Sequence, residues 1–186
     1  PEWLVDQLEQ PVETLLAAGQ SDTLAFEHEG ETVRVFVDSV TARPDLVVFG
    51  TGHDVTPVVE LADRMDFRVT VVGFRGGLAT AERFPNADRV LSTSPAQIHE
   101  TLAFDEDTYA VVMTHNVVDD TIAIEELLET ETPYIGLMGP TERFEEVVED
   151  IEADREPLSD AELDRIYTPV GLDLGGGTPY QIALSI

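Results

Sequence analysis

From Asp45 onward, short apolar runs alternate with longer amphipathic stretches, each bounded by turn residues. This alternation is typical of βα units around a parallel sheet. It predicts an α/β fold with a doubly wound, mainly parallel sheet of five strands. The expected strands are 46–50, 68–73, 89–92, 109–114 and 134–138.

Helices are expected between and after these strands, and a loop over 169–177 is expected to precede the last one. The expected helical segments are 55–65, about 95–102, about 120–129, 141–154, 160–165 and 178–186.

The first 44 residues have a different pattern. An amphipathic segment, 3–18, precedes two alternating stretches, 23–29 and 32–39, that meet at Gly30 and predict a β-hairpin. Pro44 restrains the residue before it and lacks a backbone donor, so it suits a boundary. We therefore expect a small N-terminal leader element over residues 1–44 and one larger domain over 45–186.

The charge of the chain is strongly negative, with 38 Asp+Glu against 10 Lys+Arg and a formal net charge of −28. Every basic residue is an arginine. A lysine-free surface dense in carboxylates is expected of a halophilic protein, because molar salt screens self-repulsion over about 3 Å. The same negative field disfavours binding to nucleic acid and to anionic membranes.

Neither a membrane-spanning apolar run nor a basic-then-apolar signal segment is evident, so a cytoplasmic location is expected. The chain has no cysteine, which excludes disulfides, thiolate metal sites and thiol catalysis.

The strongest local motif is the sequence Gly50, Thr51, Gly52, His53, Asp54, Val55, which lies at the end of an apolar strand and at the start of a helix. Glycines at this point allow a tight turn and a close approach of the backbone to a phosphate at the helix N-terminus. The alternative is a tight turn without a ligand. His53 could contact an anion, or it could serve only in capping or packing.

A second polar group follows the strand 109–114, at the edge of the sheet where ligands bind in open α/β folds. It comprises Thr114, His115 and Asn116, and Asp119 follows. These residues could form a pocket beside the glycine loop, or Asp119 could merely cap the helix that follows. The strand 68–73 ends without the carboxylate that holds an adenosine ribose, and Arg75 follows it, which favours a phosphorylated ligand.

Two further glycine-rich stretches are expected to reach the same edge. They contain Gly139 in one case, and Asp173, Gly175 and Gly176 in the other. No nucleophile elbow, P-loop or zinc-protease motif is present, so no catalytic residue and no metal site are predicted.

Five segments together carry a resemblance to a known family. They are 46–72, 84–90, 111–120, 133–147 and 166–186. The chain resembles the Rossmann domain of the XdhC/CoxI family over about residues 45–186, and its fold is therefore expected to be Rossmann-like. The family's GxGH loop falls on Gly50, Gly52 and His53, its Thr-His motif falls on Thr114 and His115, and a third motif falls on 170–173.

Members of this family are accessory factors for molybdenum hydroxylases such as xanthine dehydrogenase and carbon monoxide dehydrogenase. The resemblance implies a non-catalytic chaperone that binds the molybdenum cofactor, a molybdopterin, and helps its sulfuration and insertion into a molybdenum hydroxylase apo-enzyme. An NAD(P)-dependent oxidoreductase using NADP, or a nucleotide-sensing module, remains the alternative, and the oligomeric state, a homodimer included, stays open. The chain departs from the family pattern at Val55, Gly73, Asn116 and Gly177.

Overall fold

The computed structural model describes residues 1–40 and 42–186. The chain divides into two compact units, Pro1–Ala42 and Arg43–Ile186.

The smaller unit is a helix and a β-hairpin. Its elements are α1 (Glu2–Ala17), β1 (Asp22–His28) and β2 (Glu31–Val37). The strands pair antiparallel, and Glu29 and Gly30 between them both have positive φ, as two-residue hairpin turns require. Trp3 stacks on His28 with 3.9 Å between the ring centroids. The N-terminal hairpin expected from the sequence is confirmed.

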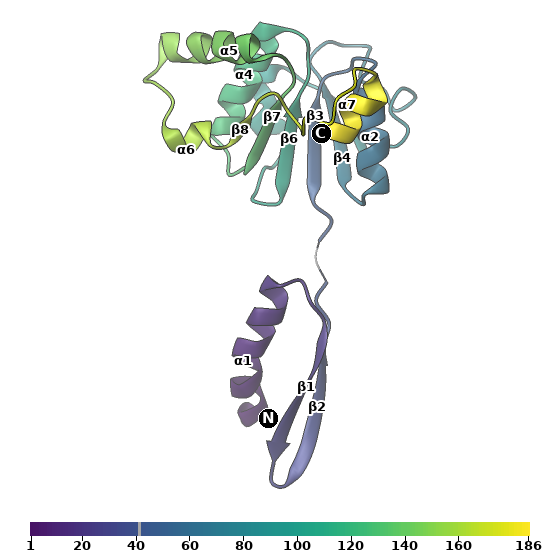
Figure 1. Cartoon of the computed structure of the whole chain (residues 1–186), viewed down its shortest axis with the longest axis vertical. Helices are drawn as coiled ribbons and strands as arrows, with labels where there is room; N and C mark the ends of the chain where they lie inside the picture. The colour runs from purple at the N-terminus through teal and green to yellow at the C-terminus, as the bar shows by residue number, and fades with distance from the viewer. Residues whose placement is uncertain (41) are drawn as a thin grey trace. The chain divides into compact units, whose positions relative to one another are not determined.

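The larger unit contains one parallel sheet (Figure 1). Its strands are β3 (Asp45–Phe49), β4 (Arg68–Gly73), β5 (Arg89–Ser92), β6 (Thr108–Val112), β7 (Tyr134–Leu137) and β8 (Ile166–Tyr167). Their order in the sheet is β5-β4-β3-β6-β7-β8. This is the order 3-2-1-4-5-6 of the Rossmann fold, counted within the unit, so the expected α/β doubly wound class is confirmed.

The sheet has six strands, whereas the sequence predicts five. The sixth, β8, has only two residues and directly follows the short helix α6. Such a short strand shows no alternation of apolar and polar residues, and only its pairing with Ile135 and Gly136 of β7 defines it.

Helices cover both faces of the sheet, and each face has its own apolar core (Figure 1). One core contains residues of α2 (Val55–Arg64) and α7 (Pro179–Ser185). The core on the opposite face contains residues that belong to the other helices or directly adjoin them. These helices are the 3-10 turn η1 (Pro95–Gln97), α3 (Ile98–Thr101), α4 (Val117–Leu128), α5 (Thr141–Asp154) and α6 (Asp160–Leu163).

Helix α4 begins three residues earlier than the sequence predicts. Asn116 is its N-cap, and the Asn116 side chain accepts a hydrogen bond from the Asp119 N–H at 3.0 Å. An N-cap asparagine satisfies a backbone donor that the first helical turn leaves free. The cap of this helix is therefore Asn116 rather than Asp119.

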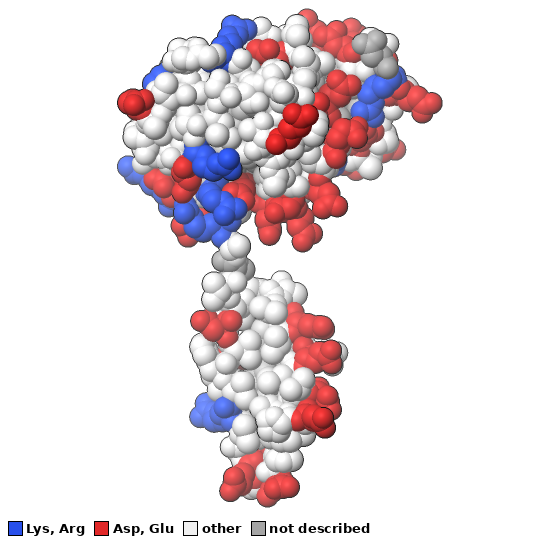
Figure 2. All heavy atoms as spheres, turned by 180° about the vertical axis from the view of Figure 1, so that it is seen from behind, with Lys and Arg blue, Asp and Glu red and all other residues white. Residues whose placement is uncertain are grey.

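Figure 2 shows groups of acidic side chains on both units, among uncharged surface. Several arginines of the larger unit lie among carboxylates: Arg43 pairs with Asp66 and Asp88, and Arg68 pairs with Asp45. Among the described residues, no helix is both long enough and apolar enough to cross a membrane.

Candidate functional site

The candidate site lies at the carboxyl ends of β3 and β6. After β3 the chain turns toward one face of the sheet, and after β6 it turns toward the other. These two strands are neighbours in the sheet, and their carboxyl ends form the switch point at which open α/β folds bind ligands. A hollow of about 200 Å³ opens there. Its lining residues are Gly50, Thr51, Gly52, Phe74, Arg75, Leu78, Thr114, His115 and Asp119.

The glycine loop starts with Gly50, which is tied to the sheet by a 2.9 Å hydrogen bond from its N–H to the Val72 carbonyl. Gly50 has φ +146°, and a Cβ there would lie 2.5 Å from the Met113 carbonyl oxygen. Only glycine lets the end of β3 pass this close to the end of β6. The loop is therefore shaped by the contact between the two strands that flank the hollow.

His115 and Asp54 form a pair that connects the two sides of the hollow. The Nε2 atom of His115 lies 2.8 Å from Oδ2 of Asp54, although 61 residues separate them in the sequence. Asp54 is only 4% exposed, whereas the His115 side chain is 55% exposed. Within the part of the chain that is described, the other carboxylate oxygen of Asp54 has no hydrogen-bond partner.

His115 also has an unusual backbone conformation, with φ +60°. A non-glycine residue in the left-handed region is strained, and such residues cluster at functional sites. The conformation lets the chain turn sharply after β6 while the imidazole reaches Asp54. Gly52 completes this arrangement, because a Cβ there would collide with Oδ1 of Asp54 and lie 3.5 Å from Cδ2 of His115.

A buried ion pair between Asp120 and Arg143 stabilises the turn after β6. Asp120 at the start of α4 is fully buried and accepts hydrogen bonds from the Thr114 hydroxyl at 2.5 Å and from Nε of Arg143 at 2.8 Å. Arg143 comes from α5, and it packs against Gly139, whose Cβ position lies 2.5 Å from Cδ of Arg143. This network fixes the position of Thr114 at the wall of the hollow.

A charged pair lies at the side of the hollow. Arg75, which follows β4, is mostly exposed, and its guanidinium lies 3.5 Å from a carboxylate oxygen of Asp119. An exposed pair at this distance contributes little stability and leaves the guanidinium available to an anionic ligand.

The structure brings half of the sequence-predicted residues together in the hollow. These are Gly50, Thr51, Gly52, Arg75, Thr114 and His115. His53 is exposed beside the loop, Asn116 caps α4, and Gly139 supports Arg143.

Asp173, Gly175 and Gly176 do not line the hollow and lie in the segment before α7. There the side-chain carbonyl of Gln181 accepts hydrogen bonds at 3.2 Å from the N–H groups of Gly177 and Thr178. The glycines of this segment thus lie beside the start of α7.

Sequence reasoning missed three residues of the site: Asp54, Phe74 and Leu78. Asp54 belongs to the motif 50–55 and directly follows His53, and that position is the one signal in the sequence that singles it out. Asp119, which the sequence left open as either a pocket residue or a cap, lines the hollow. No group of three or more His, Asp or Glu residues suited to hold a metal ion occurs among the described residues.

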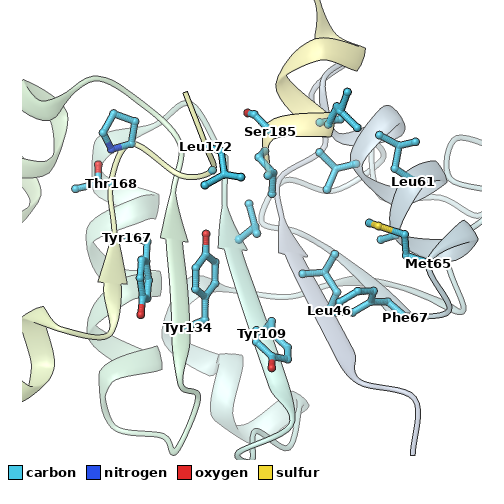
Figure 3. Close-up of a pocket in the computed structure, with 18 of the residues that line it drawn as sticks. Leu46, Leu61, Met65, Phe67, Tyr109, Tyr134, Tyr167, Thr168, Leu172 and Ser185 are labelled. Atoms are coloured by element: carbon cyan, nitrogen blue, oxygen red, sulfur yellow. The ribbon is translucent and has the colours of Figure 1, made fainter. Parts of the chain in front are cut away.

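A larger cavity of about 820 Å³ lies elsewhere, on the face of the sheet beside α2 and α7 (Figure 3). Tyr109, Tyr134 and Tyr167 stand there on β6, β7 and β8, and the last two are stacked with 4.4 Å between their centroids. Burial raises the pKa of Tyr134. The side chains that line this cavity carry no charge, so it lacks a basic group to hold a phosphate. The smaller hollow is therefore the better candidate site.

A family model described as the XdhC Rossmann domain matches residues 46–186. The chain belongs to the XdhC family. The match spans nearly all of the larger unit, and it contains every residue that lines the hollow.

Known relatives of this XdhC chain agree with the assignment. A probable xanthine dehydrogenase subunit from Bacillus subtilis is 32% identical over 164 residues, which are 88% of this chain and 47% of the relative. An uncharacterized protein of Escherichia coli, YqeB, is 25% identical over 84% of this chain and 28% of its own length.

A solved structure, described as a xanthine dehydrogenase from Bacillus halodurans, is also similar. It has a TM-score of 0.69 and 29% identity, and the match covers 95% of this chain and 49% of that one. The XdhC chain described here therefore spans about half the length of this protein and of the B. subtilis relative, and less of YqeB.

Proposed function

We propose that the chain is an accessory protein of a molybdenum hydroxylase of the xanthine dehydrogenase type. It binds the molybdenum cofactor at the switch-point hollow and assists its sulfuration and insertion into the apo-enzyme. The XdhC assignment and the names of the two Bacillus relatives support the link to xanthine dehydrogenase.

The observation that carries the proposal is the composition of the hollow. It combines a glycine loop at the N-terminal end of α2, the Arg75 guanidinium and a histidine fixed by a buried carboxylate. Backbone N–H groups at a helix N-terminus and an arginine are the groups that proteins use for phosphate. The molybdenum cofactor carries a phosphate, which gives it an anionic end for this hollow.

The volume of the hollow limits how the cofactor binds. Pockets that enclose a drug-sized ligand have volumes of roughly 300–1,000 Å³, and this one has about 200 Å³. The hollow thus suits one charged end of the cofactor. The rest of the cofactor stays accessible, as a protein that passes its ligand to another requires.

The residues at the end of β4 make NADP a second candidate ligand. Gly73 stands where an NAD-binding protein has the carboxylate that holds the ribose, and the space beside it is filled by Thr51 and Ala79, each 2.8 Å from its Cβ position. Arg75 follows two residues later and suits a 2′-phosphate. The same site could therefore serve an oxidoreductase or a nucleotide sensor that uses NADP.

Anaerobic binding titrations distinguish these ligands. Molybdenum cofactor released from a hydroxylase should bind the purified chain more tightly than NADP does. Arg75→Ala should weaken cofactor binding about tenfold, the loss of one charge-assisted hydrogen bond. Arg64→Ala, which removes an arginine from the last turn of α2, is the matched control and should bind as wild type does.

Transfer to the client enzyme is the second measurement. The loaded chain should restore xanthine oxidation to a molybdenum-free apo-hydroxylase, and Arg75→Ala should restore less at the same concentration. If the chain binds NADP tightly, turns over the nicotinamide and does not bind the molybdenum cofactor, the accessory role is wrong. The chain would then be an oxidoreductase.

A further inference from the structure

The Asp54 carboxylate poses an electrostatic problem for a site that takes an anion. It is buried at the N-cap of α2, where the helix dipole would otherwise favour a phosphate. One of its oxygens contacts His115, and the other faces Gly52, and both of these residues line the hollow. An anion in the hollow would therefore approach the negative charge of a buried carboxylate.

The other charged groups near the hollow relieve this repulsion only in part. Arg75 already pairs with Asp119 at 3.5 Å, and Arg83 donates a 2.9 Å hydrogen bond to the Thr51 carbonyl. His115 is the charged or titratable side chain that contacts the carboxylate of Asp54 directly. Its protonation is the most direct way to neutralise that carboxylate.

The geometry of His115 allows this protonation. When neutral, the ring uses Nε2–H to donate to Asp54, which leaves the lone pair of Nδ1 free. The side chain is more than half exposed, so Nδ1 can take a proton from a buffer acid in the solvent. The new N–H bond turns the imidazole into a cation that donates from both nitrogens, one toward Asp54 and one toward a ligand.

We propose that the Asp54–His115 pair takes up one proton when an anionic ligand end enters the hollow, so that capture of the ligand is coupled to pH. The inference rests on the proposed function, because it takes the molybdenum cofactor as the anionic ligand. Affinity falls as the pH rises, since the proton must then be drawn from a more alkaline solution. Release of the cofactor returns the proton.

The test is calorimetric titration of the whole chain with released molybdenum cofactor, under anaerobic conditions, in Tris and in HEPES. The heats in the two buffers differ by the protons taken up, and we expect about one per site, because the ring has one free nitrogen. Affinity should fall about tenfold for each pH unit over which the full proton is taken up, as linkage requires. The range from about pH 7 to pH 8.5 is suitable, because the second pKa of a phosphate monoester is about 6.

Variants separate this coupling from a merely structural role. Asp54→Asn keeps a hydrogen-bond acceptor but removes the charge, so the variant should bind at pH 8.5 at least as well as wild type and take up no proton. His115→Gln cannot be protonated, and its affinity should be about tenfold lower than that of wild type at pH 7 and independent of pH between about 7 and 8.5. Combining the two changes should recover part of that lost affinity.

A second histidine–carboxylate pair provides the control. His99 pairs with Glu126 on the surface of the same unit, away from the hollow. His99→Gln should leave both the affinity and the proton uptake unchanged.

The outcomes distinguish the coupling from the function. Cofactor binding without proton uptake, equal at both pH values, would overturn the coupling and leave the accessory role standing. Failure of wild type to bind the cofactor would overturn the accessory role and the coupling with it. If Asp54→Asn does not fold, His115→Gln still decides, since pH-dependent binding in that variant would refute the coupling.

Discussion

A methyl group at position 52 would test whether the glycine loop is kept open for the Asp54 carboxylate rather than for a ligand. The Cβ of Gly52→Ala would collide with Oδ1 of Asp54. Because Asp54 is 4% exposed and bonded to His115, the carboxylate cannot move aside without losing that contact. The variant should therefore be destabilised even when no ligand is present.

Two contributions set the magnitude. Overpacking a tight site costs about 1–3 kcal/mol, and a hydrogen bond to a charged group contributes about 1.5–3 kcal/mol. His115 is partly exposed, so the second contribution should lie at its lower end. We expect Gly52→Ala to lower the free energy of unfolding by roughly 2.5–4.5 kcal/mol.

Gly76 is the matched control, since it lies in the turn after β4 and a Cβ there meets nothing within 4 Å. Gly76→Ala should change the stability by less than about 0.5 kcal/mol.

Urea unfolding in molar potassium chloride, followed by far-ultraviolet circular dichroism, is the suitable assay. Urea carries no charge and leaves the screening constant, and the single tryptophan, Trp3, belongs to the smaller unit and would report on that unit alone. The decisive comparison repeats the Gly52→Ala change in a protein that already carries Asp54→Ala. If Gly52→Ala costs as much there as in wild type, the methyl group does not act through the carboxylate and the reasoning is refuted.

Three further predictions concern stability. The melting temperature should rise between about 0.1 M and 2 M potassium chloride, because salt screens the net charge of −28; a constant melting temperature would contradict the halophilic interpretation. Hydrogen bonds from Ser159 and the ion pair with Arg155 lower the pKa of Glu162 from 4.5 to about 2, so its contribution to stability is complete above pH 4.5 and is lost as the pH falls toward 2. Acid titrations of wild type and Glu162→Gln should show a gap in stability that closes over this range, and a gap that stays constant would contradict the lowered pKa of Glu162. Arg143→Ala leaves the buried Asp120 without its charge partner and should lower the free energy of unfolding in urea by about 3–5 kcal/mol; a change below about 1 kcal/mol would show that the network does not hold the turn after β6.

The elements that the sequence predicts well are those with a long, local pattern. The apolar runs of β3, β4, β6 and β7 are strands, and the glycine loop follows β3 as expected. The two-residue strand β8 and the early start of α4 were not predicted, because one is defined by pairing and the other by a side-chain cap.

The site was predicted only in part, for two physical reasons. Asp54 is one of 38 acidic residues, and acidic residues lie mostly on the surface. Its burial could therefore not be inferred from the sequence. Its contact with His115 joins positions 61 residues apart, and only the fold reveals it. The segment with Gly175 and Gly176 was expected at the hollow because it is rich in glycine, yet it lies beside the start of α7.

Hydrogen exchange of the backbone amides, with and without released molybdenum cofactor, tests the central claim most directly. We expect slower exchange on binding at residues 51–55 and 114–119, the two segments that supply lining residues from opposite sides of the switch-point hollow. Protection confined to β6, β7 and β8 around Tyr109, Tyr134 and Tyr167 would place the cofactor in the larger cavity and contradict it.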